Sequence, residues 1–278
     1  MPPLSSVTTP TIQISVINET TVLPDTDIAP VIAALQKQVT NDFFPAWGSN
    51  AKLTTVERGT QPPPGSWWLV LLDDTDQANA LGYHDLTSEG LPIGKVFAAS
   101  DLKAGTSWTV TASHEVLEML GDPNIDLTVF VQNTNTAGML YAYEVCDACE
   151  DDTLGYKIDN VLLSDFVYPS WFESFRIEGS TQFDRMNKME KPLQLLAGGY
   201  IGIFHVNAGS GWTQETAEKR PANLLHRGGV GTRRERRAIP HDQWINSLPQ
   251  RKIASNAQKY RQQIETIQLK RKAALVAA

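Results

Sequence analysis

The chain of 278 residues contains only two cysteines and has no long hydrophobic run. With two cysteines it cannot build the disulfide framework on which small secreted domains depend. Its apolar stretches, such as 67–72 and 201–206, are far shorter than the ~20 residues that a transmembrane helix needs. The N-terminus lacks a basic segment followed by an apolar one, so we expect no signal peptide and a cytoplasmic or virion-associated protein.

The two cysteines form a single Cys146-x-x-Cys149 motif. A redox pair and half of a zinc site are both compatible with this spacing, but a zinc knuckle needs a second ligand pair of similar spacing, which the sequence lacks. The flanking residues are rich in carboxylates, which raise the pKa of a thiol and disfavour a reactive thiolate. We therefore favour plain buried thiols.

The formal net charge of −7 is unevenly distributed along the chain. Residues 1–217 hold 10 Lys and Arg against 27 Asp and Glu, a balance of −17, whereas residues 218–278 hold 14 against 4, a balance of +10. The change coincides with a Gly/Arg-rich stretch. We expect a folded domain over 1–217 that begins with a frayed N-terminal arm, a basic linker over 218–240, and a helical arm over 241–278.

The C-terminal arm carries a short apolar seam and two basic clusters. The seam repeats at steps of 4, 3, 4 and 3 and consists of Ile253, Ala257, Tyr260, Ile264 and Ile267. It docks either on its own domain or on another subunit. The basic clusters, 233–237 and 270–272, could contact nucleic-acid phosphates, but the acidic body would repel the same polyanion. Self-association is therefore the favoured use of the arm.

Hydrophobic periodicity and turn residues predict an α+β fold in which helices pack on a mixed sheet. Helices are expected over 30–43 and 107–120. Strands are expected over 11–16, 51–57, 67–72, 93–99, 128–132, 139–145, 156–158, 161–167 and 200–206. The segment 82–85 is interpreted as a loop.

The strongest chemical signal is the sequence His114-Glu115-Val-Leu-Glu118 inside the second helix. Residues i and i+4 share one face of a helix, so His114 and Glu118 can bind one metal ion, while Glu115 lies about 100° away. The H-E-x-x-H motif of metalloproteases uses this geometry, with the intervening glutamate as general base. Here a glutamate replaces the second histidine, and a carboxylate is an accepted zinc ligand.

A chance occurrence of the pattern would leave both glutamates solvated and His114 as a core histidine. Acidic residues downstream favour the metal site instead, because an unpaired carboxylate in an apolar run is costly to bury. These residues are Glu144, Asp147 and Asp122. His84 could approach the same cleft, although a loop histidine is more often exposed.

The order of these elements resembles the zincin-like metallopeptidase fold: a mixed sheet with an edge strand at 93–99, an active-site helix, and a third ligand downstream. The segments 113–123, 143–147 and 164–172 also resemble a group of bacterial and phage-associated proteins. The resemblance covers about residues 50–215 and supplies no established substrate. It implies a metal-dependent, peptidase-like hydrolase, for which a peptide is the candidate substrate. A structural or assembly protein with the same fold and a structural or vestigial metal site is the competing interpretation.

The same resemblance assigns roles to residues. It implies that His114 and Glu118 are metal ligands and that Glu115 is the general base. For the third ligand Glu144 is the first choice, followed by Asp147 and Asp122. The cofactor is one divalent metal, for which zinc is favoured and manganese, iron or calcium are alternatives, because carboxylates suit harder cations.

We predict that the arm makes the protein associate. A chain shortened to residues 1–217 should be smaller in solution than the full chain, as measured by light scattering, while it remains folded. The electrostatic part of the contact should weaken with salt, since the Debye length falls from ~10 Å at 0.1 M to ~3 Å at 1 M. Monomers for both chains at low and high salt would contradict the prediction.

Overall fold

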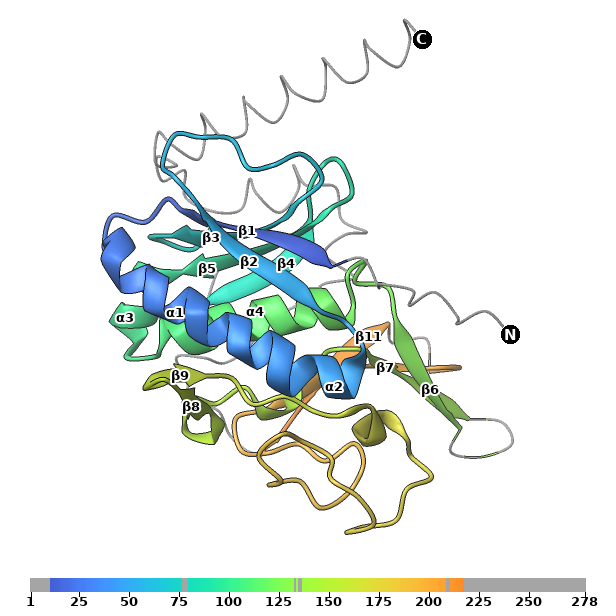
Figure 1. Cartoon of the computed structure of the whole chain (residues 1–278). Helices are drawn as coiled ribbons and strands as arrows, with labels where there is room; N and C mark the ends of the chain where they lie inside the picture. Colours follow the sequence, from blue (N-terminus) through green and yellow to red (C-terminus); the bar gives the residue numbers. More distant parts are fainter. Residues whose placement is uncertain (1–10, 77–79, 133, 135–136, 209–210, 218–278) are drawn as a thin grey trace, which may run out of the picture.

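The computed structural model describes residues 11–76, 80–132, 134, 137–208 and 211–217 (Figure 1). The N-terminal arm, the linker over 218–240 and the C-terminal arm over 241–278 lie outside the described residues. Self-association and nucleic-acid binding therefore remain predictions. Among the described helices, none has the length and apolar character that would allow it to cross a membrane.

A five-stranded mixed sheet forms one layer of the molecule. Its strands are β1 (Ile12–Asn18), β2 (Ala51–Val56), β3 (Trp67–Leu72), β4 (Gly82–Leu86) and β5 (Pro92–Phe97). The order is β2-β1-β3-β5-β4, and only β4 runs antiparallel to its neighbour. The mixed sheet is as expected, but the prediction of an edge strand at 93–99 is wrong. β5 lies inside the sheet, and the edge is β4, a segment interpreted from sequence as a loop.

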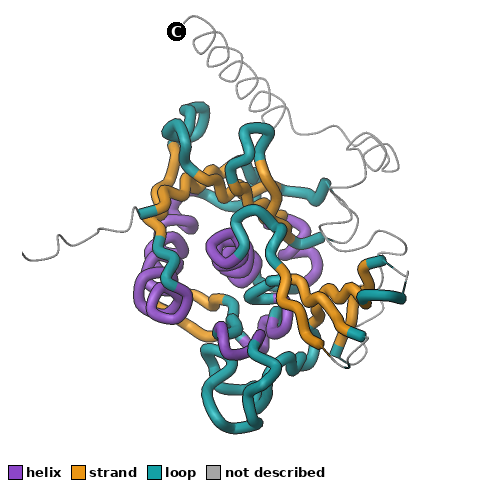
Figure 2. The backbone as a smooth tube through the Cα atoms, turned by 90° about the vertical axis from the view of Figure 1, so that its right-hand side faces the viewer, coloured by secondary structure: helices purple, strands orange, loops and turns teal. Residues whose placement is uncertain are grey.

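In the view of Figure 1 the helices lie below this sheet. They are α1 (Asp25–Lys37), which continues through a π-helical turn (Gln38–Phe43) into α2 (Phe44–Trp47), then α3 (Ala98–Ala104) and α4 (Trp108–Gly121). The first helix starts earlier than predicted, because Asp25 and Asp27 suit a helix N-terminus and the helix tolerates Pro30 in its interior. In Figure 2, α4 occupies the centre of the molecule, seen nearly end-on.

A second sheet and a short hairpin make up the rest of the fold, and the hairpin contacts α4. The sheet is antiparallel, with the order β11-β10-β7-β6, and the hairpin pairs β8 with β9. The strands are β6 (Thr128–Gln132), β7 (Gly138–Ala142), β8 (Tyr156–Ile158), β9 (Val161–Leu163), β10 (Tyr200–His205) and β11 (Trp212–Thr216). β7 is shorter than the predicted strand over 139–145, so Glu144 follows the strand instead of lying within it.

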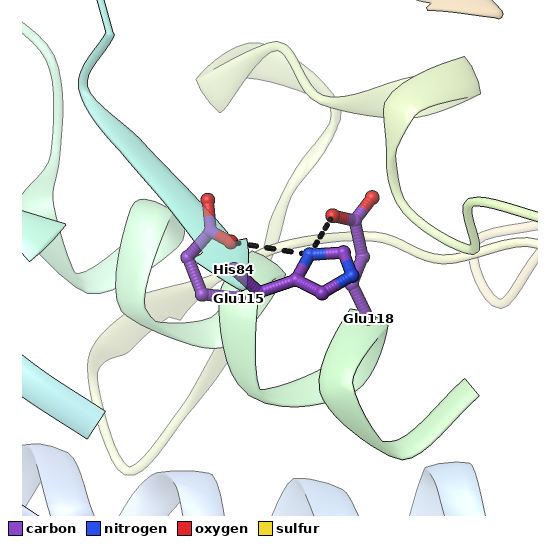
Figure 3. Close-up of side chains that lie close together, drawn as sticks. All are labelled: His84, Glu115 and Glu118. Carbon is purple, nitrogen blue, oxygen red and sulfur yellow. Dashed lines mark ion pairs between the residues drawn. The ribbon is translucent and has the colours of Figure 1, made fainter. Parts of the chain in front are cut away.

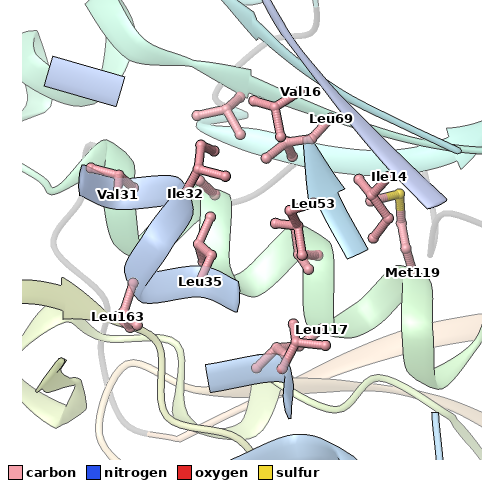
Figure 4. Packing of buried hydrophobic residues seen from close by; sticks show 14 of the residues in the cluster. Ile14, Val16, Val31, Ile32, Leu35, Leu53, Leu69, Leu117, Met119 and Leu163 are labelled. Carbon is pink, nitrogen blue, oxygen red and sulfur yellow. The ribbon is translucent and has the colours of Figure 1, made fainter. Parts of the chain in front are cut away.

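The main hydrophobic core lies between the first sheet, α1 and α4 (Figure 4). Ile14 and Leu69 from the sheet, Leu35 from α1 and Leu117 from α4 are completely buried. A second core surrounds Trp171 and the inner face of the second sheet. Because α4 contributes to the first core and the segment after it leads into the second sheet, this helix is the element around which both halves are arranged.

Two aspartates, Asp165 and Asp184, are completely buried in the second half of the fold. The carboxylate of Asp165 accepts hydrogen bonds from the backbone N–H groups of Phe166 (2.8 Å) and Met186 (3.2 Å). Burial and the neighbouring Asp184 carboxyl raise the pKa of Asp165 to about 8. The folded protein therefore favours the neutral form of Asp165 more than the unfolded chain does.

We predict that Asp165 makes the fold less stable as the pH rises. In the unfolded chain this group ionises near its ordinary pKa of 3.8, but in the folded protein it ionises only near 8. The folded state thus binds more protons between these values, and the free energy of unfolding falls as the pH rises from about 4 to about 8. Asp165→Asn mimics the neutral acid, so thermal unfolding should depend less on pH in this variant. An equal pH dependence in both proteins would contradict the prediction.

Candidate metal centre

The helix α4 is buried on nearly all sides, and this determines the environment of the H-E-x-x-E residues. All residues from Ala112 to Leu120 are buried, and the exposed fractions of Glu115 and Glu118 are 2% and 0%. The expectation of solvated glutamates, which belonged to the chance interpretation, is therefore wrong. Carboxylates this deeply buried need charged or hydrogen-bonding partners.

Three ligand atoms from α4 and the turn after β7 converge. The Nε2 atom of His114 lies 3.0 Å from Glu118 Oε1 and 3.2 Å from Asp147 Oδ1. Asp147 starts a short 3-10 turn (Asp147–Cys149) and is 3% exposed. One potential ligand atom from each residue lies within 4.8 Å of the others, so the group could hold a metal ion.

The same carboxylates control the protonation of His114. Burial alone would favour the neutral imidazole, but Glu118 and Asp147 outweigh it and raise the pKa of His114 well above its ordinary value. The proton on His114 therefore offsets part of the negative charge of the two carboxylates. A divalent cation would replace that proton, because only a neutral imidazole can act as a metal ligand.

Glu118 also lies close to a second histidine, His84 (Figure 3). The Nδ1 atom of His84 lies 3.2 Å from Glu118 Oε2 and 3.6 Å from Glu115 Oε2. These three residues form a second group whose ligand atoms lie within 4.8 Å of one another. The carboxylate of Glu118 thus lies between two imidazoles, with one oxygen facing each of them.

The sequence did not predict that His84 is part of the buried site. Its side chain was expected to be exposed on a loop, but it lies in β4 and is 1% exposed. The signal that could have located it is the turn over 87–91, where Gly90 N–H donates to the Thr87 carbonyl and closes the hairpin between β4 and β5. A hairpin there requires a strand on both sides of the turn.

The structure brings only one of the three predicted third ligands next to His114. This is Asp147, the second choice. Asp122 instead accepts hydrogen bonds from the backbone N–H groups of Asp126 (3.1 Å) and Leu127 (3.0 Å), so it shapes the turn after α4. Glu144 is buried, but among the described residues it belongs to neither potential metal group. Its predicted role as first-choice ligand gains no support from the geometry.

A buried hydrogen-bond network fixes α4 one residue before His114. Ser113 Oγ donates to Gln38 Oε1 (2.7 Å), and Gln38 Nε2 donates to the carbonyl of Ser164 (2.9 Å). The backbone N–H of Ser164 donates back to Ser113 Oγ (3.1 Å). This closed network joins the π-helical turn, α4 and the segment after β9, and so fixes the rotation of α4 about its axis.

Two glycines allow α4 to approach the sheet at the position of Glu115. A Cβ atom on Gly82 would lie 2.5 Å from Thr111 Cγ2 and 2.8 Å from Glu115 Oε1. A Cβ atom on Gly94 would lie 3.2 Å from the Cβ of Glu115. At Gly82 and Gly94 the β4–β5 hairpin has no side chain toward the helix. The helix can therefore come close enough for Glu115 and His84 to lie side by side.

The two cysteines next to the site are free thiols that are completely buried. Burial, with Glu118 as the next contribution, raises the pKa of Cys146 well above its ordinary value. Burial also raises the pKa of Cys149 well above its ordinary value. Protonated, inaccessible thiols fit the interpretation of a packing role.

Comparisons with known proteins add no relative. No protein-family model matches the chain, and neither the curated proteins nor the solved structures contain a significant match to it. The resemblance to the zincin-like fold and to phage-associated proteins therefore remains a prediction from the residues quoted above. What the molecule itself provides is the geometry of the two histidine and carboxylate groups.

We predict that Gly82→Ala destabilises the protein. Thr111 cannot easily move away from the new methyl group, because its hydroxyl donates to Asp101 (2.9 Å). Overpacking of this kind costs about 1–3 kcal/mol, measurable as a lower free energy of unfolding in urea.

Gly138→Ala is the matched control. There the new Cβ would meet the ring of Phe130, which is 55% exposed and can move aside. The control should lose less stability than Gly82→Ala. Equal losses would show that the β4–α4 approach is not tightly packed.

Proposed function

We propose that this protein is a metal-dependent hydrolase of the peptidase-like class, with one divalent cation held by His114, Glu118 and Asp147. The observation that carries the proposal is the convergence of His114 Nε2 on Glu118 Oε1 at 3.0 Å and on Asp147 Oδ1 at 3.2 Å. Such donor–acceptor separations are compatible with three ligands around one ion after small side-chain adjustments. The H-E-x-x-E spacing and the mixed sheet above the helix support the same class.

The ligand set supports zinc first and harder cations second. One imidazole and two carboxylates are accepted zinc ligands, and the same set suits manganese and iron. Calcium prefers oxygen ligands alone, so the imidazole makes it the least suitable of the four. A bound cation would supply Lewis-acid chemistry, by polarising a carbonyl and acidifying water. Two anionic ligands weaken this effect relative to a histidine-rich site.

Glu115 is proposed as the general base. It lies on the same helix one residue after His114, and its Oε2 atom lies 3.6 Å from His84 Nδ1. Its role is to accept a proton from the attacking water and to pass it to the leaving amine. His84 keeps the carboxylate of Glu115 on the side of β4, so it acts as a positioning residue.

The burial of the site favours one alternative function. No member of the His114 group is more than 6% exposed, so the group offers a substrate almost no accessible surface. A structural cation that holds α4 to the turn at Asp147 would need no approach at all. This role belongs to the competing interpretation of an assembly protein with a structural metal site.

We predict that the purified protein binds a divalent cation and that His114→Ala removes the cation held with Glu118 and Asp147, so that the cation content measured by elemental analysis after dialysis falls. Glu115→Gln should keep the cation and lose hydrolysis of a fluorogenic peptide library by ~10² to 10⁴-fold, because removal of a general base costs that much. Glu57→Gln, the same substitution at an exposed glutamate, is the matched control and should behave like the unaltered protein.

The outcomes separate the two functions. Cation binding without peptide hydrolysis in the unaltered protein would favour the structural role. Equal hydrolysis by the Glu115→Gln variant and the control would remove Glu115 from the chemistry. A protein that binds no cation, with the same stability in chelator and in excess zinc, would contradict the proposal as a whole.

A further inference from the structure

A second set of potential ligands lies directly beside the first. It consists of His84 on β4 and of Glu115 and Glu118 on α4, with exposed fractions of 1%, 2% and 0%. His84 Nδ1 lies 3.2 Å from Glu118 Oε2 and 3.6 Å from Glu115 Oε2. The set therefore has the same composition as the first one: one imidazole nitrogen and two carboxylates (Figure 3).

The backbone holds this second set in place. His84 pairs with Gly94 in the β4–β5 hairpin, so its side chain is fixed by the register of two strands. Gly82 and Gly94 present no side chain to α4, and a Cβ on Gly82 would lie 2.8 Å from Glu115 Oε1. The position between the hairpin and the helix is thus built by rigid elements, as a binding site for a small ion requires.

Glu118 belongs to both sets and uses a different oxygen in each. Its Oε1 atom faces His114, and its Oε2 atom faces His84. A carboxylate that offers one oxygen to each of two positions is suited to bridge two cations. In two-metal enzyme sites the ions lie about 3.5–4 Å apart, a distance that one carboxylate spans.

The charges of the combined cluster favour more than one cation. The carboxylates of Glu115, Glu118 and Asp147 face two imidazoles, so the formal charge of these five groups is −3 with both histidines neutral and −1 with both protonated. One divalent cation with two neutral histidines also leaves one negative charge. Two divalent cations exceed the three negative charges by only one, which a hydroxide or a substrate carboxylate would balance.

We propose that the protein has a second divalent cation position formed by His84, Glu115 and Glu118, and that Glu118 bridges the two cations. This inference rests on the proposed function, because Glu118 is a ligand of the first position as well. When the second position is filled, Glu115 is a ligand and cannot act as the general base. Hydrolysis by Glu115 therefore belongs to the protein with one cation, and the second cation suppresses it.

The test is the number of cations per chain in the full-length protein, measured by native mass spectrometry with saturating Zn²⁺ and again with Mn²⁺. The unaltered protein and the Glu57→Gln control should bind two. His84→Phe and Glu115→Gln should each bind one. Asp147→Asn should also bind one, because it disrupts the first position and leaves the second. Glu115→Gln preserves the size of the side chain, so it remains informative if His84→Phe does not fold.

A spectroscopic measurement tests the bridge itself. With two Mn²⁺ ions bound, electron paramagnetic resonance of the unaltered protein should show magnetic coupling between the ions. Glu115→Gln and Asp147→Asn, with one ion each, should give the uncoupled six-line spectrum. Two uncoupled ions in the unaltered protein would overturn the bridging role of Glu118.

The cation counts of the variants distinguish a failure of the second position from a failure of the proposed function. One cation in the unaltered protein that is retained by His84→Phe and lost by Asp147→Asn would overturn the second position and leave the proposed function intact. No cation in any of the proteins would overturn both.

Discussion

The carboxylate of Glu118 is the group on which the arrangement of the site depends. It is completely buried in the central helix, where an uncompensated negative charge would be prohibitively costly. Its two oxygens are compensated by different parts of the chain: His114 lies on the same helix, and His84 reaches it from the edge strand β4. The pairing therefore ties the first sheet to α4 electrostatically, in addition to their apolar contact.

The rest of the fold restricts how α4 can lie. On one side, Gly82 and Gly94 let the β4–β5 hairpin approach the helix closely. On the other, the network of Gln38, Ser113 and Ser164 fixes the rotation of the helix. The glycine contacts and the hydrogen-bond network both lie within one helical turn of His114 and Glu118. Close packing and buried hydrogen bonds therefore occur next to the buried charged side chains. This combination is typical of a functional site.

Much of this arrangement could be predicted from the sequence. The i, i+4 spacing of His114 and Glu118 placed both on one helix face, and their contact distance agrees with it, because helix geometry is local. The mixed sheet also followed from alternating apolar segments. The identity of the third group, Asp147 and not Glu144, depends on where β7 ends, and a boundary of this kind is set by tertiary packing.

His84 illustrates what sequence patterns miss. A five-residue edge strand gives a weak periodic signal, and only the hairpin with β5 defines it. The inward direction of its side chain depends on strand register, which two glycines and the approach of a distant helix determine. No local rule connects residue 84 with residue 118. The pairing becomes visible only when both elements are assembled.

We have proposed that the buried histidine and carboxylate cluster is a cation site. Crystals grown with Zn²⁺ and measured at the zinc absorption edge test it most directly. We expect an anomalous peak about 2.0–2.2 Å from His114 Nε2 and from carboxylate oxygens of Glu118 and Asp147. Well-ordered side chains with no anomalous peak between them, in the presence of excess zinc, would contradict it and leave the cluster as a set of buried ion pairs.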